Sequence, residues 1–189
     1  MLAVSMLMLG LAATPAAPSQ IDAAKVIAAT TGSFSNDGTM TRAVLIEDKD
    51  NDAADLAIYA ANVGDDYVQV AFAHDIAFSG AMFGTQPELR TTKTGALQVY
   101  SENTGVGRDK WERTLTLAFR DGHYVVAGLT LSAWDGLDPK GGGTCDVNYL
   151  TGKGTANPTR GGHTAVKVAA GGIPVEKWSE DSVPADCQF

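Results

Sequence analysis

Short apolar runs, several of them alternating with polar positions, cover most of the chain after residue 40. Each is about four to eight residues long and bounded by Gly, Asp, Asn or Pro, which is typical of β-strands. The expected strands outside the hairpin described below cover residues 42–47, 56–60, 67–73, 88–92, 96–101, 145–150 and 163–169. The glycines between residues 152 and 162 predict a long loop. The pattern therefore predicts an all-β protein, either an antiparallel β-sandwich or a curved β-meander.

One hairpin is specified by its turn residues. Asp121-Gly122 is a favoured pair for a two-residue type I′ turn. Folding the chain there pairs Phe119 with Tyr124, Leu117 with Val126, and Leu115 with Gly128. These side chains share one face, and a one-residue slip would move the small residues of the other face into their place. Gly128 leaves a gap opposite Leu115 that a bulge or a close neighbour would fill.

The first 20 residues contain no charged side chain. An apolar run from Met1 to Ala13 precedes a stretch of small residues, which is the order of a secretory signal peptide. The run is too short to span a membrane, which takes about 20 apolar residues. We predict a signal peptide over residues 1–16, cleaved after Ala16. The usual basic start is missing, so either the free amine of Met1 supplies the charge or the chain starts further upstream.

After cleavage, residues 17–189 are expected to form a single all-β domain that begins with a short helix. Ser19 and Asp22 have the spacing of a helix-capping box. The predicted helix covers residues 23–30 and ends at Gly32, because glycine commonly follows the last helical turn.

The net charge and the two cysteines limit the partners and the cellular compartment that we expect for the protein. The net charge of −8 opposes binding to phosphate backbones, so we expect no nucleic-acid partner. No second long apolar run follows the signal, so we expect no membrane span after cleavage. The two cysteines, Cys145 and Cys187, are predicted to form a disulfide, as an even pair in an exported protein usually does. Two free thiols or a cysteine nucleophile are the alternatives.

An acidic stretch is the densest group of ionisable residues: Asp48, Asp50, Asp52 and Asp55. Carboxylates at alternate loop positions can wrap a Ca²⁺ ion, which takes six to eight oxygen ligands. The stretch resembles the Asp-rich loop of FG-GAP and VCBS repeats, in which an Asp-Leu pair follows, as Asp55-Leu56 does here. It departs from that loop at Ala53, where the repeats have glycine, and Asp55 comes one residue early. The alternative to a calcium site is a solvated acidic turn.

Two tryptophans are candidates for a binding surface. Trp134 and Asp135 follow the hairpin in a loop, and loops often carry binding residues. This position makes the pair a candidate for ligand binding, with ordinary packing as the alternative that the residues favour. Trp111 lies among cations that include Arg113, and it shares a face with Leu115. This pattern favours core packing of Trp111 and leaves a ligand-stacking platform as the alternative.

Catalytic motifs are not evident in the sequence. The three histidines, His74, His123 and His163, are far apart and lack metal-site spacing. The stretch around Gly152 is not a phosphate-binding loop, and no nucleophile elbow occurs. A glycosidase carboxylate pair remains open, but the sequence does not place it. The absence of catalytic spacing favours a binding protein over an enzyme.

Residues 101–153 resemble a group of exported bacterial β proteins. The resemblance is carried by Ser101-Glu102-Asn103, Gly107-Arg108, Arg120-Asp121-Gly122 and above all by residues 148–153, Asn-Tyr-Leu-Thr-Gly-Lys. In that group a hairpin precedes the closing N-Y-L-T-G-K segment, and no activity is attached to it. The resemblance implies a periplasmic β domain and supplies no catalytic residues.

Three functional hypotheses follow from these observations. We expect an exported protein, periplasmic or secreted, that serves as a binding or interaction module for an envelope or extracellular partner. The first alternative is a hydrolase that acts on envelope glycans or other extracellular substrates. The second is a structural β domain stabilised by calcium. For the binding module and the hydrolase we expect no cofactor.

Overall fold

The protein consists of two antiparallel β-sheets. The computed structural model describes residues 21–189 apart from residues 36, 65, 81–83 and 106. The predicted signal peptide, residues 1–16, and Ser19 lie outside this part of the chain. In the described residues, the helical elements are 3₁₀ turns of three residues each: η1 (Ala23–Lys25), η3 (Val175–Lys177), η4 (Glu180–Ser182) and η5 (Ala185–Cys187). None of the described helices is long and apolar enough to cross a membrane. The all-β prediction is confirmed.

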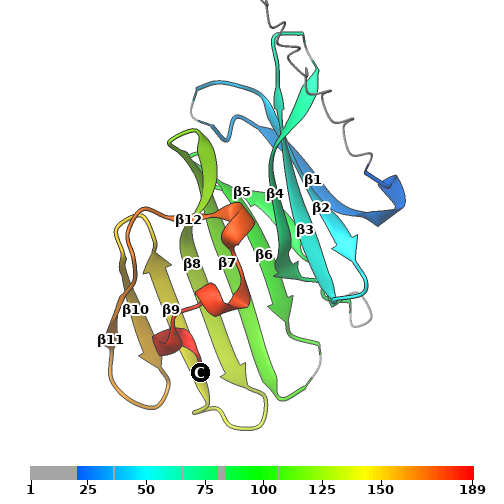
Figure 1. The fold of residues 1–189 in the computed structure, drawn as a ribbon. Coiled ribbons are helices and arrows are strands. Elements are labelled where there is room, and N and C mark those ends of the chain that lie inside the picture. Colours follow the sequence, from blue (N-terminus) through cyan, green and yellow to red (C-terminus); the bar gives the residue numbers. More distant parts are fainter. Residues whose placement is uncertain (1–20, 36, 65, 81–83, 106) are drawn as a thin grey trace, which may run out of the picture.

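The smaller sheet has four strands in chain order. They are β1 (Val26–Gly32), β2 (Thr41–Asp48), β3 (Ala53–Ala61) and β4 (Tyr67–Phe78). Each strand pairs with its neighbour in the sequence, as in a meander (Figure 1).

The larger sheet has eight strands, and most of them also pair with their neighbours in the sequence. Seven of them follow in chain order from β5 to β11, and β12 pairs with β8. They are β5 (Glu88–Thr91), β6 (Leu97–Asn103), β7 (Asp109–Arg120), β8 (His123–Asp135), β9 (Gly142–Asn148), β10 (Lys153–Pro158), β11 (Thr164–Lys167) and β12 (Ile173–Pro174).

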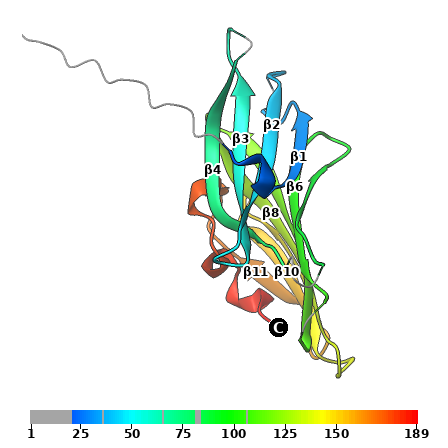
Figure 2. The same ribbon diagram turned by 90° about the vertical axis from the view of Figure 1, so that its right-hand side faces the viewer.

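The two sheets share one hydrophobic core. Leu45 and Ile58 of the smaller sheet belong to the same buried cluster as Leu115 and Val147 of the larger sheet. Figure 2 shows the smaller sheet lying against one face of the larger sheet. Burial of apolar side chains between the sheets therefore holds them together.

The predicted N-terminal helix over residues 23–30 is wrong. Only the turn η1 is helical, and the Asp22 carboxylate accepts a hydrogen bond from the Ala24 N–H at 3.0 Å. Residues 26–32 form β1 and pair with β2. Val26, Ile27 and the threonines of this segment are β-branched, and such residues favour a strand when a partner is available.

The β7–β8 hairpin has the predicted turn and, near the turn, the predicted register. Asp121 and Gly122 have φ angles of +50° and +85°, as a type I′ turn requires. Phe119 pairs with Tyr124, as predicted. Beyond Leu117 the register shifts, because Ala127 is an extra residue on β8.

This β-bulge changes the outer half of the hairpin. Leu115 pairs with Leu129, and Gly128 pairs with Thr116 instead of Leu115. The Ala127 carbonyl accepts a hydrogen bond from the Tyr149 N–H at 2.9 Å, so the bulge is bound to the chain after β9. The register shift therefore places Leu129 opposite Leu115, where the sequence predicted a gap at Gly128.

The loop predicted for residues 152–162 contains strand β10, so this prediction is wrong for Lys153–Pro158. Gly154 weakened the strand signal in the sequence. A Cβ atom at Gly154 would lie 2.6 Å from the Asp146 carbonyl oxygen of β9. Glycine is therefore needed here for close contact between strands.

The Asp121-Gly122 turn gives a direct test of the fold. Gly122→Val should lower the free energy of unfolding by about 1–2 kcal/mol, because an L side chain is strained in the left-handed region. The added Cβ would meet no atom within 4 Å, so a clash cannot explain the effect. Gly162→Val is the matched control, because Gly162 also has open space but no positive φ. Urea unfolding of both variants measures the difference, and equal stabilities would contradict the turn assignment.

Candidate functional site

A cavity of about 640 Å³ lies beside the core, where both sheets meet the end of the chain. One wall consists of the β2–β3 turn and strand β4, and a second is the inner face of β7 and β8. The third wall is formed by residues 180–189. Its volume lies in the range of about 300–1,000 Å³ that is typical of small-molecule sites. It is the candidate functional site.

The third wall belongs to a segment that we call the C-terminal strap, residues 175–189. It crosses the face of the larger sheet as the three turns η3, η4 and η5 (Figure 1). Cys187 lies at disulfide-bonding distance from Cys145 of β9, with Cα atoms 5.5 Å apart, as predicted. The Tyr149 hydroxyl donates a hydrogen bond to the Ser182 carbonyl at 2.9 Å. These two links hold the strap against the sheet.

The N-Y-L-T-G-K segment, residues 148–153, has a structural role in this arrangement. The Asn148 side chain accepts a hydrogen bond from the Thr151 N–H at 2.9 Å, and Gly152 has a φ of +71°. The segment is thus the turn between β9 and β10, and it places Tyr149 under the strap. Burial raises the pKa of the Tyr149 hydroxyl to about 12, so this hydroxyl remains a donor at neutral pH.

Arg113 is the central charged residue of the cavity. It lies on β7 on the same inward face as Leu115 and Leu117, and its side chain is only 4% exposed. Its Nη1 donates to both carboxylate oxygens of Glu180 at 2.5 and 2.6 Å. The Glu180 side chain is 70% exposed, so the partner lies on the solvent side of the pair.

The other nitrogen atoms of Arg113 have no partner in the described part of the chain. Its Nε and Nη2 atoms are buried and have no hydrogen-bond partner among the described residues. A buried donor without an acceptor costs about 1–3 kcal/mol. Arg113 also lines the cavity, so these donors are candidates for an acceptor supplied by a ligand.

Aromatic side chains lie next to this guanidinium. Trp111 and Phe78 meet edge to face with ring centroids 5.7 Å apart, and both line the cavity. The Arg113 Cζ atom lies 5.4 Å from the centre of the Trp111 ring. Trp111 is half-buried and packs against Phe78, so the core-packing prediction holds in part. Its position fits the alternative, a platform on which a ligand can stack.

Exposed carboxylates form part of the lining, and we call this exposed part the mouth of the cavity. Asp52 and Asp75 belong to the wall formed by the smaller sheet, and Asp181 belongs to the strap. With Glu180, the lining residues carry four carboxylates and one guanidinium, Arg113. The cavity therefore combines a buried cation with a negatively charged mouth.

The predicted calcium ligands are only partly brought together. Asp48 and Asp55 lie with Asp75 in one group, with ligand oxygens within 4.8 Å of one another. Asp75 was not predicted, and a register shift in the β3–β4 pairing brings it opposite Asp55. The Asp55 carboxylate accepts a hydrogen bond from the Asp75 N–H at 3.0 Å and lies 3.5 Å from the His74 ring nitrogen.

The other two residues of the predicted calcium site lie apart from this group. Asp50 is exposed in the turn between β2 and β3. Asp52 has a φ of +50° and lines the cavity.

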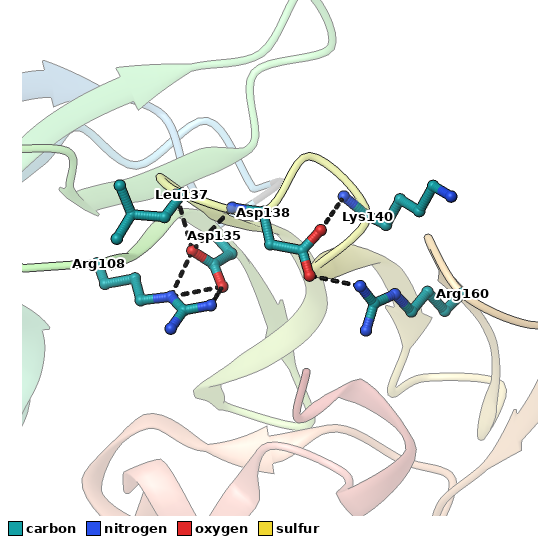
Figure 3. Close-up of polar contacts among 6 residues, drawn as sticks. All are labelled: Arg108, Asp135, Leu137, Asp138, Lys140 and Arg160. Atoms are coloured by element: carbon teal, nitrogen blue, oxygen red, sulfur yellow. Dashed lines mark hydrogen bonds and ion pairs between the residues drawn. The ribbon is translucent and has the colours of Figure 1, made fainter.

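The predicted ligand-binding pair, Trp134 and Asp135, does not line the cavity. The predicted loop position of the pair is wrong, because both residues end strand β8 and pair with β7. Trp134 is 38% exposed. Figure 3 shows Asp135 in a network with Arg108, whose Nε lies 2.7 Å from each carboxylate oxygen. Asp135 also accepts the N–H of Leu137 at 2.8 Å. Asp135 thus orders the β8–β9 loop, and a binding role for the pair stays a prediction.

Arg113 could have been noticed in the sequence, where it stands out only as a cation near Trp111. In a strand, residues two apart share a face, so Arg113 takes an inward position in the series with Leu115 and Leu117. A charged residue at a core-facing position is the signal that points to it.

Neither a family model, a curated protein nor a solved structure matches the chain. The resemblances of residues 148–153 and of the acidic stretch therefore remain predictions.

The loop network makes a prediction about acid pH. Hydrogen bonding to Arg108 holds the pKa of Asp135 at about 2, below the ordinary 3.8. A lowered pKa means that this carboxylate stabilises the loop fully above pH 3.8 and that the contribution is lost as the pH falls towards 2. Arg108→Ala should raise the pKa of Asp135 towards 3.8 in an NMR titration.

Arg160→Ala is the control for this titration. Arg160 pairs with Asp138 of the same loop, so its removal should leave the pKa of Asp135 low. A wild-type pKa of Asp135 near 3.8 would contradict the network.

Proposed function

We propose that the protein is an exported binding module, periplasmic or secreted, that holds a small organic ligand from the envelope or the extracellular space in its cavity. The observation that carries this proposal is the buried Arg113, with two unpaired donors beside a cavity of about 640 Å³. Aromatic side chains and polar groups converge on the same space, which is the usual make-up of a ligand site.

Export is supported by separate observations. The uncharged start of the chain is typical of a signal peptide. Cys145 and Cys187 lie at disulfide distance, and such bonds persist in oxidising compartments. A binding module is supported by Arg113, a buried recognition group in the cavity lining. The carboxylates of the same lining keep the hydrolase as the alternative.

A variant in which a large side chain fills the cavity tests this function. Ala133 lines the cavity, whereas Ser132 points to the opposite face of β8. Ala133→Trp should fill the site and Ser132→Trp should leave it open. We expect one class in a panel of amino acids, peptides, sugars and organic acids to raise the melting temperature of the wild type. The rise should be about 5–10 °C at a hundredfold excess over Kd.

The variants separate the possible outcomes of this assay. The same ligand should stabilise Ser132→Trp and leave Ala133→Trp unchanged. No stabilisation of the wild type, or equal stabilisation of both variants, would reject the cavity as the site. Turnover of the ligand, followed by mass spectrometry, would favour the hydrolase instead.

The group of Asp48, Asp55 and Asp75 favours a second candidate function, a calcium-stabilised β domain. If these oxygens hold Ca²⁺, millimolar calcium should raise the melting temperature, by the equivalent of about 2.7 kcal/mol at a hundredfold excess over Kd. Asp55→Asn should abolish the shift, and Asp50→Asn should retain it because Asp50 lies outside the group. A melting temperature that calcium does not change would reject this candidate.

A further inference from the structure

We propose that the ligand of this cavity is a zwitterion, a free α-amino acid or a short peptide with an aromatic or other apolar side chain. Its carboxylate would pair with Arg113 at the floor, and its ammonium group would lie among the carboxylates of the mouth. This inference rests on the proposed function, because it names the ligand class of the same cavity. The observations that carry it are the unpaired donors of Arg113 and the distribution of charge around them.

The floor is suited to a carboxylate. The guanidinium of arginine is a planar fork that bonds a carboxylate through two nitrogens at once. Glu180 uses only Nη1, and Nε and Nη2 have no partner in the described part of the chain. A ligand carboxylate that displaces Glu180 from Nη1 would form the bidentate pair with Nη1 and Nη2, which Glu180 does not form.

Binding would require the Glu180 side chain to move aside. Nε and Nη2 are buried in this state. Glu180 comes from the strap and is 70% exposed, whereas Arg113 is fixed on a central strand. Glu180 is thus the movable partner, and it holds the place of the ligand carboxylate until the ligand displaces it.

The mouth is suited to an ammonium group. Asp52 and Asp75 on one wall and Asp181 on the strap are exposed carboxylates of the lining. A simple anion would be repelled at this mouth, and a simple cation would leave the donors of Arg113 unpaired. A zwitterion satisfies both ends.

Much of the remaining lining is apolar. It includes Phe78, Leu131, Val183 and Phe189 together with Trp111. An aromatic or aliphatic side chain of the ligand would bury its surface there. The chain as a whole carries a net charge of −8, which opposes anions but not a ligand without net charge.

A matched series of ligands tests the proposal by calorimetry on the oxidised protein. L-Phenylalanine carries both charged groups, N-acetyl-L-phenylalanine lacks the ammonium, and L-phenylalaninamide lacks the carboxylate. We expect phenylalanine or the dipeptide phenylalanyl-glycine to bind, and each single-charge derivative to bind at least about tenfold more weakly. Comparison of phenylalanine with the dipeptide distinguishes a free amino acid from a peptide.

Variants of the lining residues test which side chains bind the ammonium group and which bind the carboxylate of the ligand. Asp52→Asn and Asp181→Asn should weaken binding of the zwitterion, whereas Asp50→Asn and Asp186→Asn, outside the lining, should not. Arg113→Lys keeps the charge but loses the fork, and should weaken binding of the zwitterion but not of the amide. Glu180→Gln removes the competing carboxylate and should tighten binding of the zwitterion.

Several results would overturn the proposal. Equal affinity for phenylalanine and its N-acetyl or amide derivative would remove one end of the recognition. Weaker binding to Glu180→Gln would show that Glu180 contacts the ligand or supports the site and does not hold its place. If another class binds wild type but not Ala133→Trp and no zwitterion binds, this inference fails while the proposed function stands. If nothing binds in either assay, both fail.

Discussion

The link between Cys145 and Cys187 is the constraint on which the candidate site depends. The strap consists of 3₁₀ turns of three residues each, which are too short to be stable on their own. The two cysteines are 42 residues apart in the sequence. On the chain-entropy model, a disulfide that closes a loop of this length stabilises the folded protein by about 4 kcal/mol. Together with the hydrogen bond from Tyr149 to Ser182, it fixes the third wall of the cavity.

The two charged partners in the cavity, Arg113 and Glu180, differ in how firmly the fold holds them. Arg113 projects from β7, which is hydrogen-bonded on both sides by β6 and β8, so the sheet fixes its position. Its counterion Glu180 lies on the strap and is largely exposed. The charge that would recognise a ligand is therefore held in place, and the group that competes for it can leave.

The sequence predicts best what is determined locally. The turn at Asp121-Gly122 was predictable because its backbone conformation limits the residues that can occupy it. The segment 26–32 was misassigned because its strand exists only through pairing with β2. The shift at Ala127 was not predictable in position, because it depends on a hydrogen bond from Tyr149, which follows another strand. Tertiary contacts overrode local preference in both cases.

The candidate site was less predictable than the fold for the same reason. Arg113 and Glu180 are 67 residues apart, and no local pattern joins them. The acidic stretch was visible as a group, but the β3–β4 register brought Asp75 into it and left Asp50 outside. Residues close in sequence can thus lie on different surfaces, and the pairing of strands decides which side chains meet.

The meander order has a consequence for how the protein assembles. Nearly every strand pairs with its neighbour in the sequence, so each hairpin closes only a short loop. The strap is the exception, because it follows β12 in the sequence and returns to β9. During synthesis the strands of both sheets therefore emerge before the segment that completes the cavity.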